Sequence, residues 1–281
     1  MARTKHFLDT SVLRSWMLGP KLHRDYFDSE FGEEKCYISR FVLMELVRSF
    51  VRCSVDFCLL LDMPEIESVA DALKLWSNKF TGSQHKAVEQ LVGAVTEWHK
   101  IDLNSPGDKS KALTAFAAYL ERVLLVTEER FRDTGMNSPR CSRAAVKFEV
   151  DQASVARSLG DFAKAFDGTD GLRDQCRVHE FLLTRFRTAI EGYAASAKAM
   201  KNNQSTRGFL KIAERLDKVL QKGESACTCA CCAAIGDAVI ALDAPRNMRL
   251  EHTDASYNHL CPPIEQPHQE HPSADALLKQ C

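Results

Sequence analysis

Apolar residues recur along most of the chain with the spacing of an amphipathic helix. Val88, Leu91, Val92 and Val95 follow one another at intervals of three, one and three residues. Residues spaced in this way lie on one face of an α-helix. The same spacing returns within 113–124, 182–193 and 209–220. The pattern therefore predicts that the region 56–224 is built from helices.

The two ends of the chain have a different pattern, which predicts strands. Short apolar runs at 5–8 and 35–39 are each followed by a helical pattern. After residue 225 the alternating character returns, with predicted strands at 227–231 and 247–253 and a short helix at 236–244. Strands separated by helices favour a parallel α/β sheet.

These patterns divide the chain into three parts. We expect an α/β domain formed by residues 1–55 and 225–262, with its sheet flanked by helices. A large all-helical insertion would occupy 56–224. The Pro- and His-bearing tail, 263–281, is expected to be a loose extension with one short terminal helix.

The composition is that of an ordinary globular protein. The chain has 281 residues, of which 45% are hydrophobic and 27% charged, enough for one large core or two modest ones. The 37 Lys and Arg nearly cancel the 38 Asp and Glu, so a nucleic-acid surface would have to be local. No run approaches the roughly 18–20 apolar residues of a membrane span, and the N-terminus lacks the apolar stretch of a signal peptide. We expect a cytoplasmic protein with no membrane segment.

Eleven cysteines in a chain of this kind are expected to be reduced thiols. Within the cluster Cys227–Cys232, Cys229 and Cys232 have the two-residue gap of a zinc half-site, and His259 with Cys261 could supply the other half. The cluster runs into an Ala-rich apolar stretch, where cysteine packs as a small hydrophobe. Core packing is the favoured interpretation.

Three acidic residues stand at positions that suit either a site or a helix cap. Asp9 follows the first predicted strand and Asp254 follows a late one. In open α/β sheets, ligands bind outside the carboxyl ends of the strands. Asp237 opens an apolar helix, so for Asp9 and Asp237 the alternative role is the N-cap of the helix that follows.

Glu45 is the one charged residue in the segment FVLMELV. A buried carboxylate is costly unless it is paired or binds a metal. The alternative partners are Arg14 and Arg48. Gathered in one crevice, the four acids would raise one another's pKa values unless a divalent cation neutralised them. Such oxygen ligands suit Mg²⁺ or Mn²⁺, which can activate a water for attack on a phosphodiester.

Four stretches, in their order along the chain, resemble the PIN-domain nucleases, including VapC-type toxins: FLDTSVL, YISRFVLMELV, IGDAVIAL and LEHTDASYNHL. The resemblance implies a PIN-like α/β fold and a ribonuclease that needs Mg²⁺ or Mn²⁺. It implies that the catalytic, metal-binding residues are Asp9, Glu45, Asp237 and Asp254. An inhibitory protein partner, as in a toxin–antitoxin pair, and a homodimer both stay open.

The resemblance also assigns residues around the acids. Thr10 and Ser11 match hydroxyl positions beside the first acid, and Tyr257 matches an aromatic residue after the last one. Thr253 directly precedes Asp254, where the family usually leaves one residue between the two. Thr10, Ser11 and Thr253 are therefore candidates for contact with the substrate.

Two other functions stay open. The stretches LDTSVL and GDAVIALD also resemble haloacid-dehalogenase-type phosphatases, in which Asp9 would be the nucleophile. Those enzymes usually carry a general acid two residues later, where this chain has Ser11, and Glu45 would be unexplained. The other alternative is a non-catalytic interaction protein that acts through its helical module. In an enzyme the four carboxylates should converge, whereas as caps they should point into their own helices.

A local basic stripe is the candidate RNA-binding surface. Residues 173–222 hold eleven Lys or Arg and five Asp or Glu. Four of the basic residues share one face of a predicted helix: Lys211, Arg215, Lys218 and Lys222. Such a stripe can follow phosphates without sequence selectivity, and a solvated helix face is the alternative.

Overall fold

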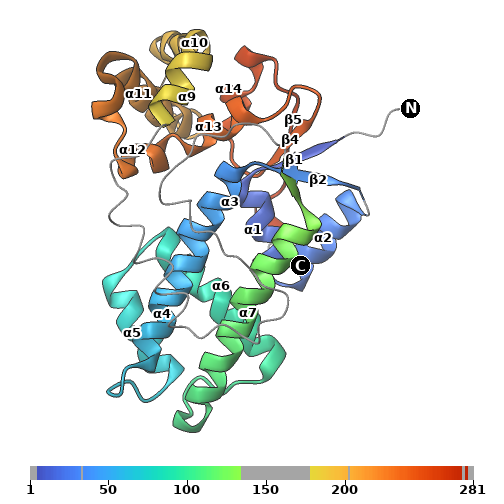
Figure 1. The fold of residues 1–281 in the computed structure, drawn as a ribbon, viewed down its shortest axis with the longest axis vertical. Helices are drawn as coiled ribbons and strands as arrows, with labels where there is room; N and C mark the ends of the chain where they lie inside the picture. The colour runs from blue at the N-terminus through green and yellow to red at the C-terminus, as the bar shows by residue number, and fades with distance from the viewer. Residues whose placement is uncertain (1–4, 33, 134–177, 202, 274–275, 278–281) are drawn as a thin grey trace.

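The structure is a computed structural model, and it describes residues 5–32, 34–133, 178–201, 203–273 and 276–277. A small parallel sheet lies between two groups of helices (Figure 1). The mixed α/β class that the sequence predicts is confirmed. Among the described helices, none has the length and apolar character needed to cross a membrane.

Five of the described segments are short parallel strands: β1 (His6–Leu8), β2 (Cys36–Ile38), β3 (Arg132–Asp133), β4 (Arg249–His252) and β5 (His268–Glu270). Their order across the sheet is β3-β2-β1-β4-β5. The chain starts in the middle, moves outward to β3, and later returns to the other side of β1. The direction of winding therefore reverses between β1 and β4, which is the point where open α/β sheets bind ligands.

The strands β1 and β2 each lead directly into a helix. α1 (Thr10–Leu18) follows β1, and α2 (Lys21–Phe31) follows α1. α3 (Arg40–Leu46) begins where Ser39 Oγ accepts a hydrogen bond from the Val42 N–H at 3.3 Å. It continues through one π-helical turn, η1 (Val47–Val51), into α4 (Arg52–Asp62). The three segments form one continuous helix that leads away from the sheet (Figure 1).

The first group of helices is α4 and the helices that pack against it. It consists of α4, α5 (Val69–Lys79), α6 (Ser83–His99), the short 3₁₀ turn η2 (Pro106–Asp108) and α7 (Lys109–Arg130). The apolar positions that predicted α6 are buried, among them Val88, Leu91 and Val95. The helical prediction for this part is therefore confirmed.

The second group lies at the opposite end of the molecule (Figure 1). It contains α9 (Val178–Arg185), α10 (Arg187–Ala199), α11 (Arg207–Lys222), the 3₁₀ turn η5 (Gly223–Ala226) and α12 (Cys229–Ala234). The chain then returns to the sheet through α13 (Gly236–Asp243) and β4, followed by α14 (Tyr257–Leu260), the 3₁₀ turn η6 (Pro262–Ile264) and β5. The predicted helix at 236–244 and strand at 247–253 are confirmed.

Three sequence predictions about elements are wrong. β3 lies inside the region expected to be all-helical and pairs with β2. β5 lies in the tail expected to be a loose extension and pairs with β4. The segment 227–231 contains no strand, because Thr228 caps α12 by accepting the Cys231 N–H at 3.2 Å. The sheet therefore takes in residues from 56–224 and from 263–281.

A buried ionic network attaches the segment around β5 to the rest of the sheet. The Glu251 carboxylate in β4 is fully buried and lies 2.7 Å from His6 Nδ1, 2.9 Å from His271 Nε2 and 2.7 Å from Arg249 Nε. Burial alone would raise the pKa of Glu251, but the hydrogen bonds from His271, His6 and Arg249 lower it to about 2. The hydrogen bond to Glu251 likewise raises the pKa of His6. Opposite charges thus replace the water that these groups lose on burial.

Candidate active site

Asp9 is a helix cap and also part of an acidic cluster. It follows β1, and its Oδ2 accepts the Ser11 N–H at 3.0 Å and the Ser11 hydroxyl. Its Oδ1 accepts the Tyr257 hydroxyl at 2.8 Å, and both residues are buried. One carboxylate therefore caps α1 and also contacts α14, so the cap and the site are not exclusive alternatives.

Glu45 reaches the same place from α3. Its Oε2 accepts the Thr10 hydroxyl at 2.8 Å. Its carboxyl group also lies against the Cα atom of Gly236 at the start of α13, where a Cβ atom would overlap Glu45 Oε1. Of its predicted alternative partners, Arg14 donates Nη2 to Gln90 Oε1 at 2.8 Å. Burial lowers the pKa of Arg14, and the charge of Glu45 acts in the opposite direction, so the two groups do interact. The side chain of Arg48 lies outside the described residues.

Asp237 and Asp254 both accept a hydrogen bond from the same residue, Ser256. The Ser256 hydroxyl donates to Asp237 Oδ2 at 2.8 Å, and its N–H donates to Asp254 Oδ1 at 2.8 Å. Asp237 is the second residue of α13, and the N-cap residue Ile235 makes no side-chain capping bond. The alternative that Asp237 caps this helix is therefore wrong, because its carboxylate turns toward the segment after β4.

Three of the acids act electrostatically on the fourth, Asp237. Burial raises the pKa of Asp237 well above its ordinary value, and the charges of Asp9, Asp254 and Glu45 raise it further. Burial also raises the pKa of Asp9, although hydrogen bonds from Ser11 and Tyr257 oppose the rise. The pKa of Tyr257 is raised by burial and then by Asp9 and Asp237. The structure thus brings the four predicted acids together at the point where the sheet reverses its winding.

The carboxylates as they stand do not form a metal-ligand set. Over the described residues, no group of three or more His, Cys, Asp or Glu side chains is arranged to hold a metal ion. Instead a serine or threonine hydroxyl donates to each of three carboxylates: Ser11 to Asp9, Thr10 to Glu45, and Ser256 to Asp237. The cluster thus combines a buried carboxyl group, Asp9, two half-buried ones, Glu45 and Asp237, and the exposed Asp254, and neutral hydroxyl groups donate to the first three.

Two of the three predicted hydroxyl residues bond to the acids through their hydroxyl groups, and the third contacts Ser11 through its backbone. Thr10 and Ser11 bond to the acids as described, and the Thr253 N–H donates to Ser11 Oγ at 3.3 Å. Ser256 and Gly236 are site residues that were not predicted from the sequence. The signal for Ser256 was its place two residues after Asp254, where an aspartate commonly accepts the N–H of such a residue in a turn. No local signal could indicate Gly236, because its role depends on a helix far away in the sequence.

The basic stripe begins close to the cluster. Gly208, in the first turn of α11, lies beside Ser256, because a Cβ atom at 208 would be 3.7 Å from Ser256 Cβ. Lys211, Arg215 and Lys222 are exposed farther along this helix. Lys218 is half-buried and donates to Glu214 Oε1 at 2.6 Å, so part of its charge is balanced. The stripe leads away from the acids along α11.

The cysteine cluster lies in the core. Cys231, Cys232 and Cys261 are buried and form no disulfide. Burial raises the pKa of Cys261 to about 12, which keeps this thiol protonated. The side chain of Cys229 lies outside the described residues. These positions are those of small core hydrophobes.

Comparison with models of known protein families, with curated proteins and with solved structures found no match to this chain.

Proposed function

We propose that this protein is a PIN-like, metal-dependent ribonuclease. The observation that carries the proposal is the set of contacts that brings the acids together: Ser256 bonds to both Asp237 and Asp254, and Glu45 lies against Gly236, the neighbour of Asp237. In this setting burial, and then the charges of the other three acids, raise the pKa of Asp237. The four carboxyl groups come from four separate segments and meet outside the carboxyl ends of β1 and β4. A fold that serves stability alone gains nothing from such repulsion, whereas catalytic sites commonly concentrate groups with perturbed pKa values.

The donor chemistry of the cluster fits Mg²⁺ or Mn²⁺. Carboxylate oxygens are the ligands that these ions prefer, and a divalent charge relieves the repulsion among them. Asp9, Glu45, Asp237 and Asp254 would hold the ion, which when bound supplies an activated water for hydrolysis of a phosphodiester. To bind an ion, the carboxylates would have to exchange some of their hydroxyl partners for it.

The other residues of the site hold the acids in place. Tyr257 and Ser11 direct the two oxygens of Asp9, and Thr10 holds Glu45 beside Gly236. Ser256 links Asp237 to the turn that carries Asp254. These contacts fix the positions of acids from distant segments, which is what ordered catalysis requires. The same hydroxyls are at hand for a phosphate oxygen.

RNA is the substrate class that the surroundings favour. Gly208, which precedes Lys211 by three residues on α11, lies beside Ser256, so a strand whose phosphates follow Arg215 and Lys211 would lead toward the acids. Such contacts supply affinity without reading sequence. The inhibitory partner, the homodimer and the toxin role remain hypotheses that follow from the resemblance alone.

The experiment is cleavage of an end-labelled, mixed-sequence RNA pool by the purified chain with Mg²⁺, with Mn²⁺ and with a chelator. The test variant is Asp237→Asn, whose amide oxygen can still accept the Ser256 hydroxyl. The matched control is Asp62→Asn, at an exposed position at the end of α4. Metal-dependent cleavage that Asp237→Asn loses and Asp62→Asn keeps would support the proposal. Cleavage that survives in Asp237→Asn, or is absent from the wild type with both metals, would reject it.

A non-catalytic interaction protein is the second candidate. The observation in its favour is that Ser11, Thr10 and Ser256 already satisfy three of the carboxylates with hydrogen bonds. An interaction protein of this kind would have the same melting temperature with and without Mg²⁺.

A further inference from the structure

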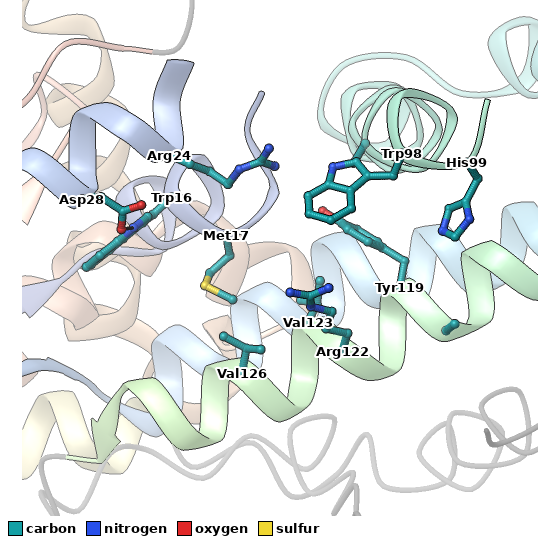
Figure 2. Close-up of a pocket in the computed structure, with 12 residues that line it drawn as sticks. Trp16, Met17, Arg24, Asp28, Trp98, His99, Tyr119, Arg122, Val123 and Val126 are labelled. Atoms are coloured by element: carbon teal, nitrogen blue, oxygen red, sulfur yellow. Dashed lines mark hydrogen bonds between the residues drawn. The ribbon is translucent and has the colours of Figure 1, made fainter. Parts of the chain in front are cut away.

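A cavity separate from the acidic cluster lies between the α1–α2 pair and the α6–α7 pair. It has a volume of about 470 Å³, within the range of roughly 300–1,000 Å³ typical of small-molecule sites. Side chains from all four helices point into it (Figure 2). Its inner wall is apolar and includes Trp16, Met17, Val123 and Val126.

The opening of the cavity carries an exposed tryptophan with two arginines beside it. Trp98 is 60% exposed, which is unusual for the largest apolar side chain. The guanidinium carbons of Arg24 and Arg122 lie 5.8 and 5.7 Å from the centre of its ring. Arg24 comes from α2 and Arg122 from α7, so two helices direct positive charge to one aromatic surface.

The described residues offer these two positive charges no carboxylate partner. Within the described part of the chain, neither Arg24 nor Arg122 forms an ion pair, and Arg24 Nη1 donates to the Gly19 carbonyl at 3.1 Å. Asp28, the acid that lines the cavity, accepts the Trp16 Nε1–H at 2.8 Å (Figure 2). Two guanidinium groups at one opening favour an anionic ligand, and arginine binds phosphate through paired hydrogen bonds.

Tyr119 lines the cavity, and its hydroxyl has no hydrogen-bond partner among the described residues. This hydroxyl is buried. Burial raises the pKa of Tyr119 to about 12, although Arg24 and Arg122 act in the opposite direction. The hydroxyl therefore keeps its proton at neutral pH and would donate to a ligand that reached it. A buried polar group without a partner costs free energy that such a ligand would recover.

We propose that this cavity binds a nucleotide. Its base would stack on the aromatic side chains Trp98 and Tyr119, and its phosphate would lie between Arg24 and Arg122. A planar aromatic group and an anion on one molecule match the two features of the opening, and aromatic side chains stack on any base. The inference goes beyond the proposed ribonuclease and does not depend on it. The two sites are also apart in space, because Trp16 on the cavity wall comes seven residues after Asp9, which is about 10 Å at the rise of an α-helix.

A nucleotide could reach the cavity free in solution or as the phosphorylated end of an RNA strand. The test is calorimetric titration of the full chain in the presence of a chelator, so that no metal-dependent cleavage takes place. The probes are AMP, adenosine, inorganic phosphate, and one short RNA with either a 5′-phosphate or a 5′-hydroxyl group. We expect AMP or the 5′-phosphorylated RNA to bind at least ten times more tightly than adenosine and phosphate. Tighter binding of AMP indicates a free nucleotide, and tighter binding of the RNA indicates a strand end.

Three variants and one control variant test the assignment. Arg24→Gln and Arg122→Gln should each weaken binding about tenfold or more, and Arg187→Gln, at an exposed position of α10, should leave it unchanged. Ala118→Phe fills the cavity from an exposed position of α7 and should abolish binding while the thermal transition persists. The proposal would be overturned if neither AMP nor the 5′-phosphorylated RNA bound up to millimolar concentration. It would also be overturned if Arg24→Gln and Arg122→Gln both bound these probes as tightly as the wild type.

Discussion

The backbone of Gly236 and the carboxyl group of Glu45 occupy neighbouring space that leaves no room for a side chain at position 236. A Cβ atom there would overlap Glu45 Oε1 and lie 3.2 Å from Glu45 Cδ. Glu45 belongs to α3 and Gly236 begins α13, so this contact joins the two ends of the chain. The absence of a side chain at Gly236 lets Glu45 approach Asp237, the next residue.

Gly236→Ala should therefore displace the Glu45 carboxyl group without unfolding the protein. The overlapping atom is the end of a flexible side chain, and alanine favours a helix by up to about 1 kcal/mol over glycine. We expect RNA cleavage to fall about tenfold or more and the melting temperature to change little. Gly192→Ala in α10 is the matched control, since an added Cβ there meets nothing within 4 Å. Equal cleavage by the two variants would contradict this role of Gly236.

Asp237→Asn should stabilise the protein in the absence of metal. An acid whose pKa is raised on folding destabilises the folded state once it is ionised, so at neutral pH removal of the charge should increase the free energy of unfolding. For a chain of this size we expect the melting temperature to rise by about 2–4 °C for each kcal/mol gained. Mg²⁺ should raise the melting temperature of the wild type and have less effect on Asp237→Asn. A lower melting temperature for the metal-free variant would argue against the repulsion.

Tyr257→Phe should destabilise the fold and also disturb Asp9. The substitution removes the hydroxyl that donates to Asp9 Oδ1 at 2.8 Å and leaves a buried acceptor, at a cost of about 1–3 kcal/mol. Tyr193→Phe is the matched control, because the buried Tyr193 hydroxyl donates to the Leu260 carbonyl at the same distance of 2.8 Å. We expect similar losses in urea denaturation and a loss of RNA cleavage only for Tyr257→Phe. If both variants cleave RNA normally, Tyr257 serves stability alone.

Glu251→Gln should remove a large part of the acid sensitivity of the fold. The pKa of Glu251 falls from 4.5 to about 2 on folding, so its ionised form adds stability above pH 4.5 that is lost as the pH falls toward 2. The shift corresponds to roughly 3 kcal/mol. We expect the variant to be less stable at pH 7 and to lose less stability than the wild type between pH 5 and pH 2.5. Parallel losses of stability over this range would contradict the assignment.

The double variant Lys211→Gln, Arg215→Gln should weaken binding of single-stranded RNA and reduce its salt dependence. Each phosphate contact contributes about 0.7 to the slope of log K against log salt, so loss of two contacts should lower the slope by about 1.4. Binding is measured by fluorescence anisotropy in a chelator at several salt concentrations. Lys218→Gln should matter less because Lys218 is paired with Glu214. A slope unchanged in the double variant would place the RNA elsewhere.

The sequence by itself determined the elements whose character is local. The apolar periodicity around Val88 and Leu91 was sufficient to predict a helix, because burial of one face follows from spacing. The acids Asp9 and Asp254 were found because strand ends can be recognised along the chain. Their convergence with Glu45 and Asp237 followed only from the resemblance and from the general placement of sites in α/β sheets.

Only the tertiary structure decided which polar segments join the sheet and which side chains meet. β3 and β5 are two and three residues long and carry polar sequences, so their pairing depends on the exposed edges of β2 and β4 and not on any pattern of their own. The contact between Gly236 and Glu45 and the cavity beside Trp98 likewise join residues that are distant along the chain. A periodic pattern shows which face of an element is buried, but the packing of the whole chain determines what lies against it.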